Sequence, residues 1–256
     1  MVVNKTQLTI HISRTSVHVA EVLRSNQNIV RESSLVLYEQ SPSEYKNKLK
    51  SFFDGLNWAD KYDEYSMAWG SPKHTLLPLS AFNESSAKAV YALMFGEDVD
   101  ENTIDFNRLM ELNFVSVFEI PDWVKSFFIM RFPQIVFKHE HAMTLRALFQ
   151  KNTFKRKIVV SFSDDYINIA VIHQNELIFS NCFEVQTAED VLYYLLFVIE
   201  QKQLKQEEGT ISFLYIDETT KEKAEQTKQL LADLKGHSKL KVTDVDHKLK
   251  LQTLCV

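Results

Sequence analysis

TIHISRTSVHVA at residues 9–20 matches VVSFSDDYINIA at residues 159–170 without a gap, at an offset of 150 positions. In both stretches apolar residues alternate with polar ones, stop at a polar turn and then alternate again, which is typical of two adjoining β-strands. The third strands align once the second turn is shortened by two residues in the C-terminal copy, and a helical pattern follows each. The match predicts that the chain contains an internal duplication.

The remaining patterns extend each copy in the same order. In the first half we expect strands at 64–70, 75–79, 113–120 and 135–137, and helices at 42–55, 83–96, 121–132 and 140–150. In the second half we expect strands at 158–162, 166–172, 177–185, 210–217 and 239–245, and helices that begin at Thr187 and at residue 219, with Gly236 ending the latter. The basic stretch KNTFKRK at 151–157 lacks a hydrophobic period and is interpreted as a linker between domains 1–150 and 151–256.

This element order predicts an α/β protein. Three antiparallel strands are followed by strands that return through helices, so the later strands join each sheet as parallel neighbours by right-handed crossovers. The unit resembles the ribonuclease H-like unit, and two tandem copies, each a mixed five-stranded sheet with helices, resemble the actin-like ATPase superfold. That superfold includes actin, sugar kinases and pilus-assembly proteins. The N-terminal strands and GSPKHTLLP at 70–78 make the chain similar to an uncharacterised Bacteroidetes family of this fold.

The resemblance also implies where a nucleotide would bind. In active members of the superfold, the first turn of each half carries Asp, then Gly one residue later, then Ser or Thr, and contacts the phosphates. Here the Asp positions hold His11 and Ser161, and the Gly positions hold Ser13 and Ser163. A glycine pair on the adenosine side has no counterpart either, because Gly209 stands alone. We therefore expect ATP hydrolysis to be absent, and the same substitutions weaken a two-metal nuclease interpretation.

Some polar residues remain candidates for a ligand site. The two first turns offer nucleotide- or anion-binding candidates, and aspartates at strand ends of the second half offer metal ligands, because open α/β sheets place ligands at that edge. The anion candidates are Ser13, Arg14, Thr15, Ser163, Asp164 and Asp165, and the metal candidates are Asp165, Asp217 and Asp244. The competing interpretation is ordinary turn and capping chemistry. His139-Glu140-His141 is a close histidine pair, but no third metal ligand is evident in the sequence.

The amino-acid composition excludes several classes of protein. The chain has 256 residues, 45% hydrophobic and 25% charged, with a formal net charge of −5, which fits a globular protein and disfavours a broad nucleic-acid surface. Only five glycines are present and none forms a phosphate-loop spacing. No apolar run is long enough for a membrane span, no signal peptide is indicated, and the two cysteines fit reduced thiols, so we expect a cytoplasmic protein.

Two functions follow as hypotheses. The first is a non-catalytic protein of actin-like fold that binds a protein partner or its own copy, with no cofactor, using apolar surface of the segment PDWVKSFFIM at 121–130. The alternative is a nucleotide-binding protein or weak ATPase, with Mg²⁺ and ATP at an altered phosphate site. We do not expect a membrane span or a nucleic-acid partner, although Lys155-Arg156-Lys157 is a short basic strip.

Overall fold

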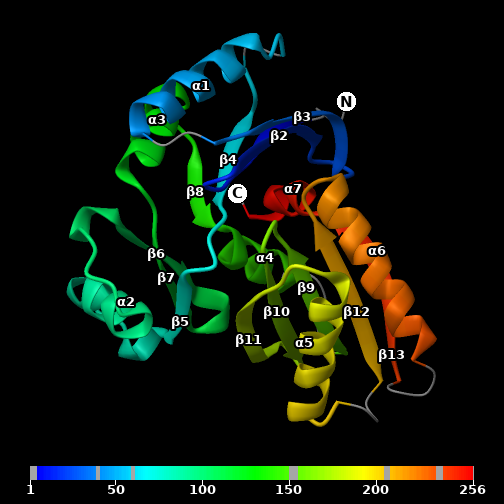
Figure 1. The fold of residues 1–256 in the computed structure, drawn as a ribbon. Coiled ribbons are helices and arrows are strands. Elements are labelled where there is room, and N and C mark those ends of the chain that lie inside the picture. Colours follow the sequence, from blue (N-terminus) through cyan, green and yellow to red (C-terminus); the bar gives the residue numbers. More distant parts are fainter. Residues whose placement is uncertain are drawn as a thin grey trace. The chain divides into compact units, whose positions relative to one another are not determined.

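The protein divides into two compact units, which we describe separately (Figure 1). The computed structural model describes residues 5–38, 41–58, 61–149, 155–204, 208–234 and 239–255, and the backbone alone of residue 244. Unit 1 comprises Met1–Met143 with Leu249–Val256, and unit 2 comprises Thr144–Lys248. The predicted boundary at residue 150 and most of the predicted linker lie outside the described residues, so the domain boundary stays a prediction.

Unit 1 is built on a mixed sheet with the strand order β3-β2-β1-β4-β8. The first three strands are antiparallel neighbours, and β1, β4 and β8 run parallel. Helices α1 and α3 pack their apolar side chains on this sheet, which explains the strong burial of the central strands. The bounds are β1 (Thr6–Ile12), β2 (Ser16–Leu23), β3 (Asn28–Val36), β4 (Glu64–Trp69), β8 (Val136–His139), α1 (Pro42–Gly55) and α3 (Asp122–Arg131). Helix α4 (Glu140–Phe149) begins in unit 1, and its residues from Thr144 onward belong to unit 2.

Helix α1 illustrates how local sequence sets an element. Ser41 accepts a hydrogen bond from the backbone N–H of Glu44, and the Glu44 carboxylate accepts one from the backbone N–H of Ser41. This capping box satisfies two donors that the first turn would otherwise leave open. Pro42 suits the first turn, and Leu49 and Phe53 turn one face into the core. Helix α1 therefore begins where its sequence predicts and buries the face that its sequence predicts.

A second, antiparallel sheet in unit 1 has the order β5-β7-β6 and is covered by α2. Its core contains Tyr91 and Val117, and α2 ends at Gly96, whose φ of 68° is left-handed. The bounds are β5 (His74–Pro78), β6 (Ile104–Leu109), β7 (Phe114–Glu119) and α2 (Ala87–Phe95). Strand β6 was not predicted: the alternation in IDFNRL extends only from Ile104 to Asn107, and the strand is completed by pairing with β7.

Unit 2 repeats the mixed sheet with the order β11-β10-β9-β12-β13. Helices α5 and α6 pack together and cover one face of it (Figure 1), and their apolar residues close a core with the sheet. The bounds are β9 (Arg156–Phe162), β10 (Tyr166–His173), β11 (Glu176–Glu184), β12 (Gly209–Tyr215), β13 (Leu240–His247), α5 (Ala188–Gln201) and α6 (Glu218–Asp233). The predicted fold class, two ribonuclease H-like units with mixed five-stranded sheets, is confirmed for the described residues.

The two units correspond element by element. Strands β1 and β2 begin and end 150 positions before β9 and β10, and β3 precedes β11 by 148, as the shortened turn predicts. The pairing of the second and third strands slips between Glu21 and Val22 in one unit and between Val171 and Ile172 in the other, again 150 positions apart. This agreement supports the aligned repeat, while descent of both units from one ancestral unit stays a prediction.

Three sequence expectations need correction or remain open. Arg156 and Lys157, which were assigned to the linker, belong to β9, where they pair with Gly209 and Thr210. A short C-terminal segment, α7 (Lys248–Leu251) and the turn Gln252–Leu254, was not predicted because its few apolar residues do not establish a period. The predicted stop at Gly236 lies outside the described residues.

The C-terminal segment completes unit 1 through a buried polar network. The Gln252 Nε2 atom donates to the carbonyl of Ile10 at 2.9 Å, and the Ser66 hydroxyl donates to Gln252 Oε1 at 2.7 Å. Gln7 Nε2 donates to Ser66 Oγ at 2.8 Å, and Gln7, Ser66 and Gln252 are all fully or nearly fully buried. Buried amides need such partners, so this network fixes the segment against β1 and β4.

Candidate functional site

The turn between β1 and β2 is held by its own hydroxyl groups. Ser13 Oγ accepts hydrogen bonds from the backbone N–H groups of Thr15 at 3.2 Å and Ser16 at 3.1 Å. It also lies within hydrogen-bond distance of the Thr15 and Ser16 hydroxyls. The side chain that replaces the expected glycine therefore occupies the backbone donors that a phosphate would require.

Arg14, an anion-binding candidate, lies beside a carboxylate of the protein. Its guanidinium lies 3.6 Å from a carboxylate oxygen of Glu119, and its side chain is 70% exposed. Its backbone carbonyl accepts a hydrogen bond from the Tyr45 hydroxyl at 3.0 Å. An exposed ion pair of this kind is weak, so Arg14 remains a side chain that an anion could recruit.

The turn between β9 and β10 is contacted by two lysines that sequence analysis missed. Lys248 Nζ donates to Ser163 Oγ at 2.9 Å, and Lys223 Nζ donates to the backbone carbonyl of Asp164 at 3.1 Å. Lys248 is 5% exposed. No linear sequence motif could reveal these lysines, because both are far from the turn in the sequence: Lys248 follows β13 and Lys223 lies in α6. The predicted turn thus combines two carboxylates with two cations.

The three predicted metal ligands occupy different structural positions. Asp165 follows β9, and Asp217 is the N-cap of α6, where its Oδ1 accepts from the Thr220 backbone N–H at 2.8 Å and from the Thr220 hydroxyl at 2.7 Å. Strand β13 extends to His247, so Asp244 lies opposite Ser212 inside the strand rather than at its end. Among the side chains that the structure describes, no group of three His, Cys, Asp or Glu residues is placed to hold a metal ion.

Unit 1 contains two groups of neighbouring histidines: His11 with His18, and His74 with His139 and His141. All of them except the partly exposed His74 are buried. The ring of His74 lies 4.3 Å from that of His139 and 4.9 Å from that of His141, between centroids. The ring of His11 lies 6.2 Å from that of His18. The sequence indicated only the pair around Glu140, because the other members come from β1, β2 and β5. His139 ends β8, whereas His141 lies in α4.

The hydrogen bonds of His139 define its protonation. Its Nε2 lies 3.0 Å from the carbonyl oxygen of Ser71, and its Nδ1 lies 3.2 Å from the backbone N–H of His141. A carbonyl only accepts and an N–H only donates, so the ring is neutral with its proton on Nε2. Burial, and next the neighbouring His74, lower the pKa of His139 well below the usual range. Burial also lowers the pKa of His74 to about 4, against an opposing effect of Glu140.

His11 occupies the position at which the resemblance implies a metal-anchoring aspartate. Its Nε2 lies 2.9 Å from a carboxylate oxygen of Glu140, and both side chains are about 3–4% exposed. Its Nδ1 is buried without a hydrogen-bond partner among the described residues. A pair of the protein's own side chains, His11 and Glu140, therefore lies at the carboxyl edge of this sheet.

The apolar segment 121–130 packs mainly into unit 1. Val124 and Phe128 are fully buried, and Trp123 stacks on Tyr45 at 4.8 Å between ring centroids. Ile129 and Met130 are the large apolar residues of this segment that are half or more exposed. Most of the apolar excess in this stretch is thus explained by packing against α1 and the sheet.

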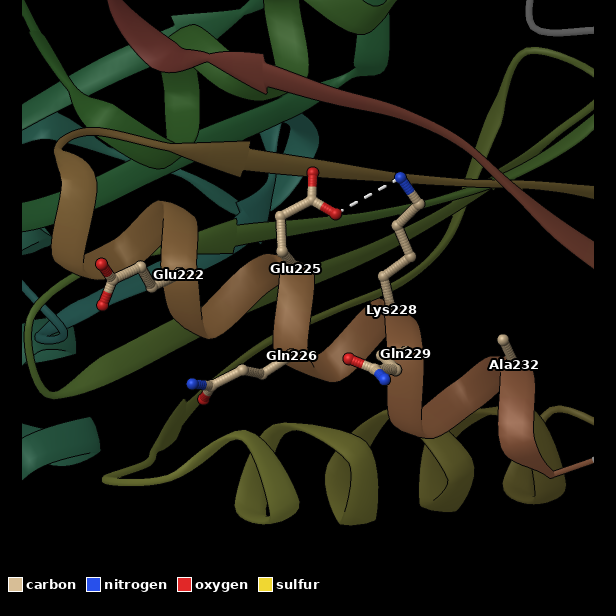
Figure 2. Close-up of a pocket in the computed structure, with 6 residues that line it drawn as sticks. All are labelled: Glu222, Glu225, Gln226, Lys228, Gln229 and Ala232. Carbon is tan, nitrogen blue, oxygen red and sulfur yellow. Dashed lines mark ion pairs between the residues drawn. The ribbon is translucent and has the colours of Figure 1, made fainter.

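Two surface hollows are also present. One, of about 470 Å³, lies along α6 and is lined by side chains of that helix, with an ion pair of 3.4 Å between Glu225 and Lys228 (Figure 2). The other, of about 510 Å³, lies where β5 ends and β7 begins, and is lined by Pro78, Leu79, Ser80, Leu112, Asn113 and Phe114. Each hollow is lined by one helix or by two adjoining segments. Neither hollow therefore has the convergent polar groups that mark a ligand site.

The strand order within each of the two five-stranded sheets is that of an actin-like ATPase fold. A structure from Bacteroides thetaiotaomicron VPI-5482, described as a protein with this fold and unknown function, is similar over 99% of this chain and 96% of that one, with a TM-score of 0.72 and 19% identity. The family model of DUF3822, described as a protein of unknown function, matches residues 3–234. The chain therefore belongs to the DUF3822 family.

Two further solved structures share the fold. One, described as the PilM-PilN type IV pilus biogenesis complex, has a TM-score of 0.60 at 10% identity, covering 97% of this chain and 98% of that chain. Inorganic polyphosphate/ATP-glucomannokinase from Arthrobacter sp. strain KM has a TM-score of 0.54 at 7% identity, covering 98% of both chains. No curated protein matches the sequence. Within the described residues, no helix is both long and apolar enough to cross a membrane.

Proposed function

We propose that this protein acts by binding another protein and does not hydrolyse nucleotide. The proposal is supported mainly by the contacts of two residues in unit 1: His11, near the end of β1, and Ser13, in the turn that follows. His11 is paired with Glu140 where a metal-anchoring aspartate would lie, and the Ser13 hydroxyl takes the N–H groups of Thr15 and Ser16. A phosphate and its metal would have to displace both sets of contacts.

The comparison with the pilus proteins supports a protein partner. The similar structure is described as a complex of PilM with PilN, so this fold is used for protein association there. Superfolds host many functions, so the argument for this chain depends on its own turn and surface. A protein ligand requires neither the glycine nor the aspartate that the turn lacks.

Thermal unfolding with and without Mg²⁺–ATP tests the catalytic part of the proposal. A ligand at about 100 times its Kd raises the unfolding free energy by about 2.7 kcal/mol, or roughly 5–10 °C in Tm for a chain of this size. We expect no such rise and no phosphate release. A rise that Asp165→Ala abolishes, together with phosphate release, would overturn the proposal.

Copurification tests the binding part. The full chain carrying an affinity tag is isolated from the cells that produce it, and the eluate is compared with that from untagged cells. We expect one protein at a fixed stoichiometric ratio that survives gel filtration. Elution of the tagged chain alone, at its monomer mass, would contradict a role in protein binding.

A second function, nucleotide or anion binding without turnover, is favoured by Lys248 and Lys223 at the β9–β10 turn. Two ammonium groups beside this turn would attract a phosphate. If this function holds, Mg²⁺–ATP raises Tm and Lys248→Met removes the rise, while Lys221→Gln, on the exposed start of α6, retains it. No nucleotide-induced rise in the wild type, or an equal rise in all three proteins, would exclude a site at this turn.

A further inference from the structure

Helix α5 presents an aromatic pair to solvent. Tyr193 is 63% exposed and Phe197 is 43% exposed, and their rings are stacked with 6.5 Å between centroids and 19° between planes. The opposite face of α5 is buried in the core of unit 2, through Val191, Leu195 and Val198 among others. The exposed pair is therefore surplus to the packing of this helix, and exposed aromatic residues are enriched where proteins associate.

The aromatic side chains continue from α5 onto the edge strand β11. Tyr194 packs edge-on against Tyr193 at 5.2 Å and stacks on Phe183 at 4.4 Å between centroids. Phe183 is in turn parallel to Phe179 at 6.4 Å. Phe179, Phe183 and Tyr194 are partly buried against the core of unit 2. We call these three residues, together with the exposed Tyr193 and Phe197, the α5–β11 aromatic surface. Figure 1 shows α5 lying alongside β11.

Two carboxylates border the exposed pair on α5. Glu189 lies four residues before Tyr193 and Glu200 three residues after Phe197, so both lie on the same side of the helix as the rings, and both are exposed. Asp190, in contrast, accepts hydrogen bonds from the backbone N–H groups of Gln186 and Thr187 at the start of the helix. Lys202, which follows α5, places its ammonium 5.3 Å from the centroid of the Phe179 ring. One ring of the surface thus already accepts a cation on its face.

We propose that the α5–β11 aromatic surface is the docking site for a protein segment that combines apolar side chains with lysine or arginine, such as a basic amphipathic helix. This inference rests on the proposed protein-binding function. Tyr193 and Phe197 would contact the apolar side of the segment, and its cations would meet the bordering carboxylates. A second copy of this chain is the poorer occupant, because a symmetric contact would bring the same carboxylates together.

The test is a titration of the full chain with synthetic peptides. The probe is a helical peptide of about 18 residues, or five turns, built from Leu and Lys in an amphipathic pattern. Its controls are the same peptide with Glu in place of Lys and a scrambled peptide of equal charge. Binding is followed by fluorescence anisotropy at low and at physiological salt, and SEC with light scattering reports the oligomeric state of the free chain.

Two variants probe the surface and two matched variants control for the change. Tyr193→Ala/Phe197→Ala removes the exposed rings, and Leu93→Ala/Met94→Ala removes exposed apolar side chains from α2. Glu189→Gln/Glu200→Gln removes two bordering charges, and Glu101→Gln/Glu111→Gln removes two exposed charges from unit 1. Circular dichroism and Tm confirm that each variant is folded.

We expect the Leu/Lys peptide to bind the wild type, and its Kd to rise about tenfold or more in Tyr193→Ala/Phe197→Ala. Glu189→Gln/Glu200→Gln should raise the Kd and flatten its salt dependence, while both control variants bind like the wild type. Three results would overturn the inference: equal binding by the aromatic variant, equal binding of the Glu peptide, or a dimer that Tyr193→Ala/Phe197→Ala dissociates. A partner that still copurifies with the aromatic variant would refute this surface alone and leave the proposed function standing.

Discussion

His11 and Glu140 are 129 positions apart in the chain, and their Nε2 and Oε2 atoms are 2.9 Å apart in unit 1. The contact joins the central strand β1 to the first residue of α4, where both side chains are almost completely buried. Because the partners come from different elements, the pair fixes where α4 begins relative to the sheet. His11, paired in this way, stands at the position where a nucleotide-hydrolysing member of the fold would carry an aspartate.

This pair should show strong energetic coupling. Glu140→Ala and His11→Ala each deprive the other buried side chain of this hydrogen-bond partner, so each is expected to lower the unfolding free energy by about 1–3 kcal/mol or more. The double variant should cost less than the sum, by about 1 kcal/mol or more. Urea unfolding of the four proteins measures the coupling. Additive losses would mean that the contact does not stabilise the fold.

Stability should fall in mild acid because of the buried histidines. In the folded protein His74 has a pKa of about 4, whereas an unfolded histidine titrates near 6.5, so the unfolded state binds more protons between these values. The contribution is fully present above pH 6.5 and is lost progressively as pH falls toward 4, by up to about 1.4 kcal/mol per pH unit. His74→Gln should reduce this slope in urea unfolding at pH 7, 6 and 5. An unchanged slope would exclude His74 as its source.

Gly209 should be required for packing at the start of β12. A Cβ at this residue would lie 2.6 Å from the backbone carbonyl oxygen of Arg156 and 2.9 Å from Leu240 Cδ2. Gly209→Ala is therefore expected to destabilise the protein by about 1–3 kcal/mol. Gly55→Ala is the matched control, because nothing lies within 4 Å of a Cβ there, and it should be neutral or stabilising by up to about 1 kcal/mol. Similar Tm values for the two variants would refute the steric argument.

Asp217 should act as a helix cap. Asp217→Ala removes the acceptor for the Thr220 backbone N–H and is expected to cost about 0.5–2 kcal/mol, whereas Asp217→Asn keeps an acceptor and should retain most of the stability. Adding Mg²⁺ separates capping from metal binding. If the wild type alone gained stability from Mg²⁺ and Asp217→Asn did not, the residue would be a metal ligand, as the sequence analysis proposed.

The strands of the sheets could be predicted because the alternation of apolar and polar residues directly indicates a strand. Residues 9–20 and 159–170 carry the complete pattern of two strands and a turn, and the offset between them holds to the residue in the structure. Capping signals were equally local, as in the box formed by Ser41 and Glu44. In contrast, the alternation in β6 covers only four residues, and the strand depends on pairing with β7, which no local pattern reveals.

The candidate site was predictable only in part. The turns at Ser13 and Ser163 follow from strand alternation, and the substitution at His11 follows from the resemblance. The partners Glu140 and Lys248 could not be foreseen, because only the folded chain brings them to these turns. Similarly, the exposure of Tyr193 and Phe197 depends on which face of α5 meets the sheet, and an almost wholly apolar helix does not specify this.

The contacts of Gln252 have a consequence for synthesis on the ribosome. Gln252 supplies buried hydrogen bonds to Ile10 and Ser66, yet it is translated after all of unit 2. The interior of the first unit to emerge is therefore satisfied only after Gln252 has been translated, while unit 2 has its strands and helices available earlier. A nascent chain stalled before this segment exposes an unfinished N-terminal sheet, which makes that interval the period in which the protein most needs a chaperone.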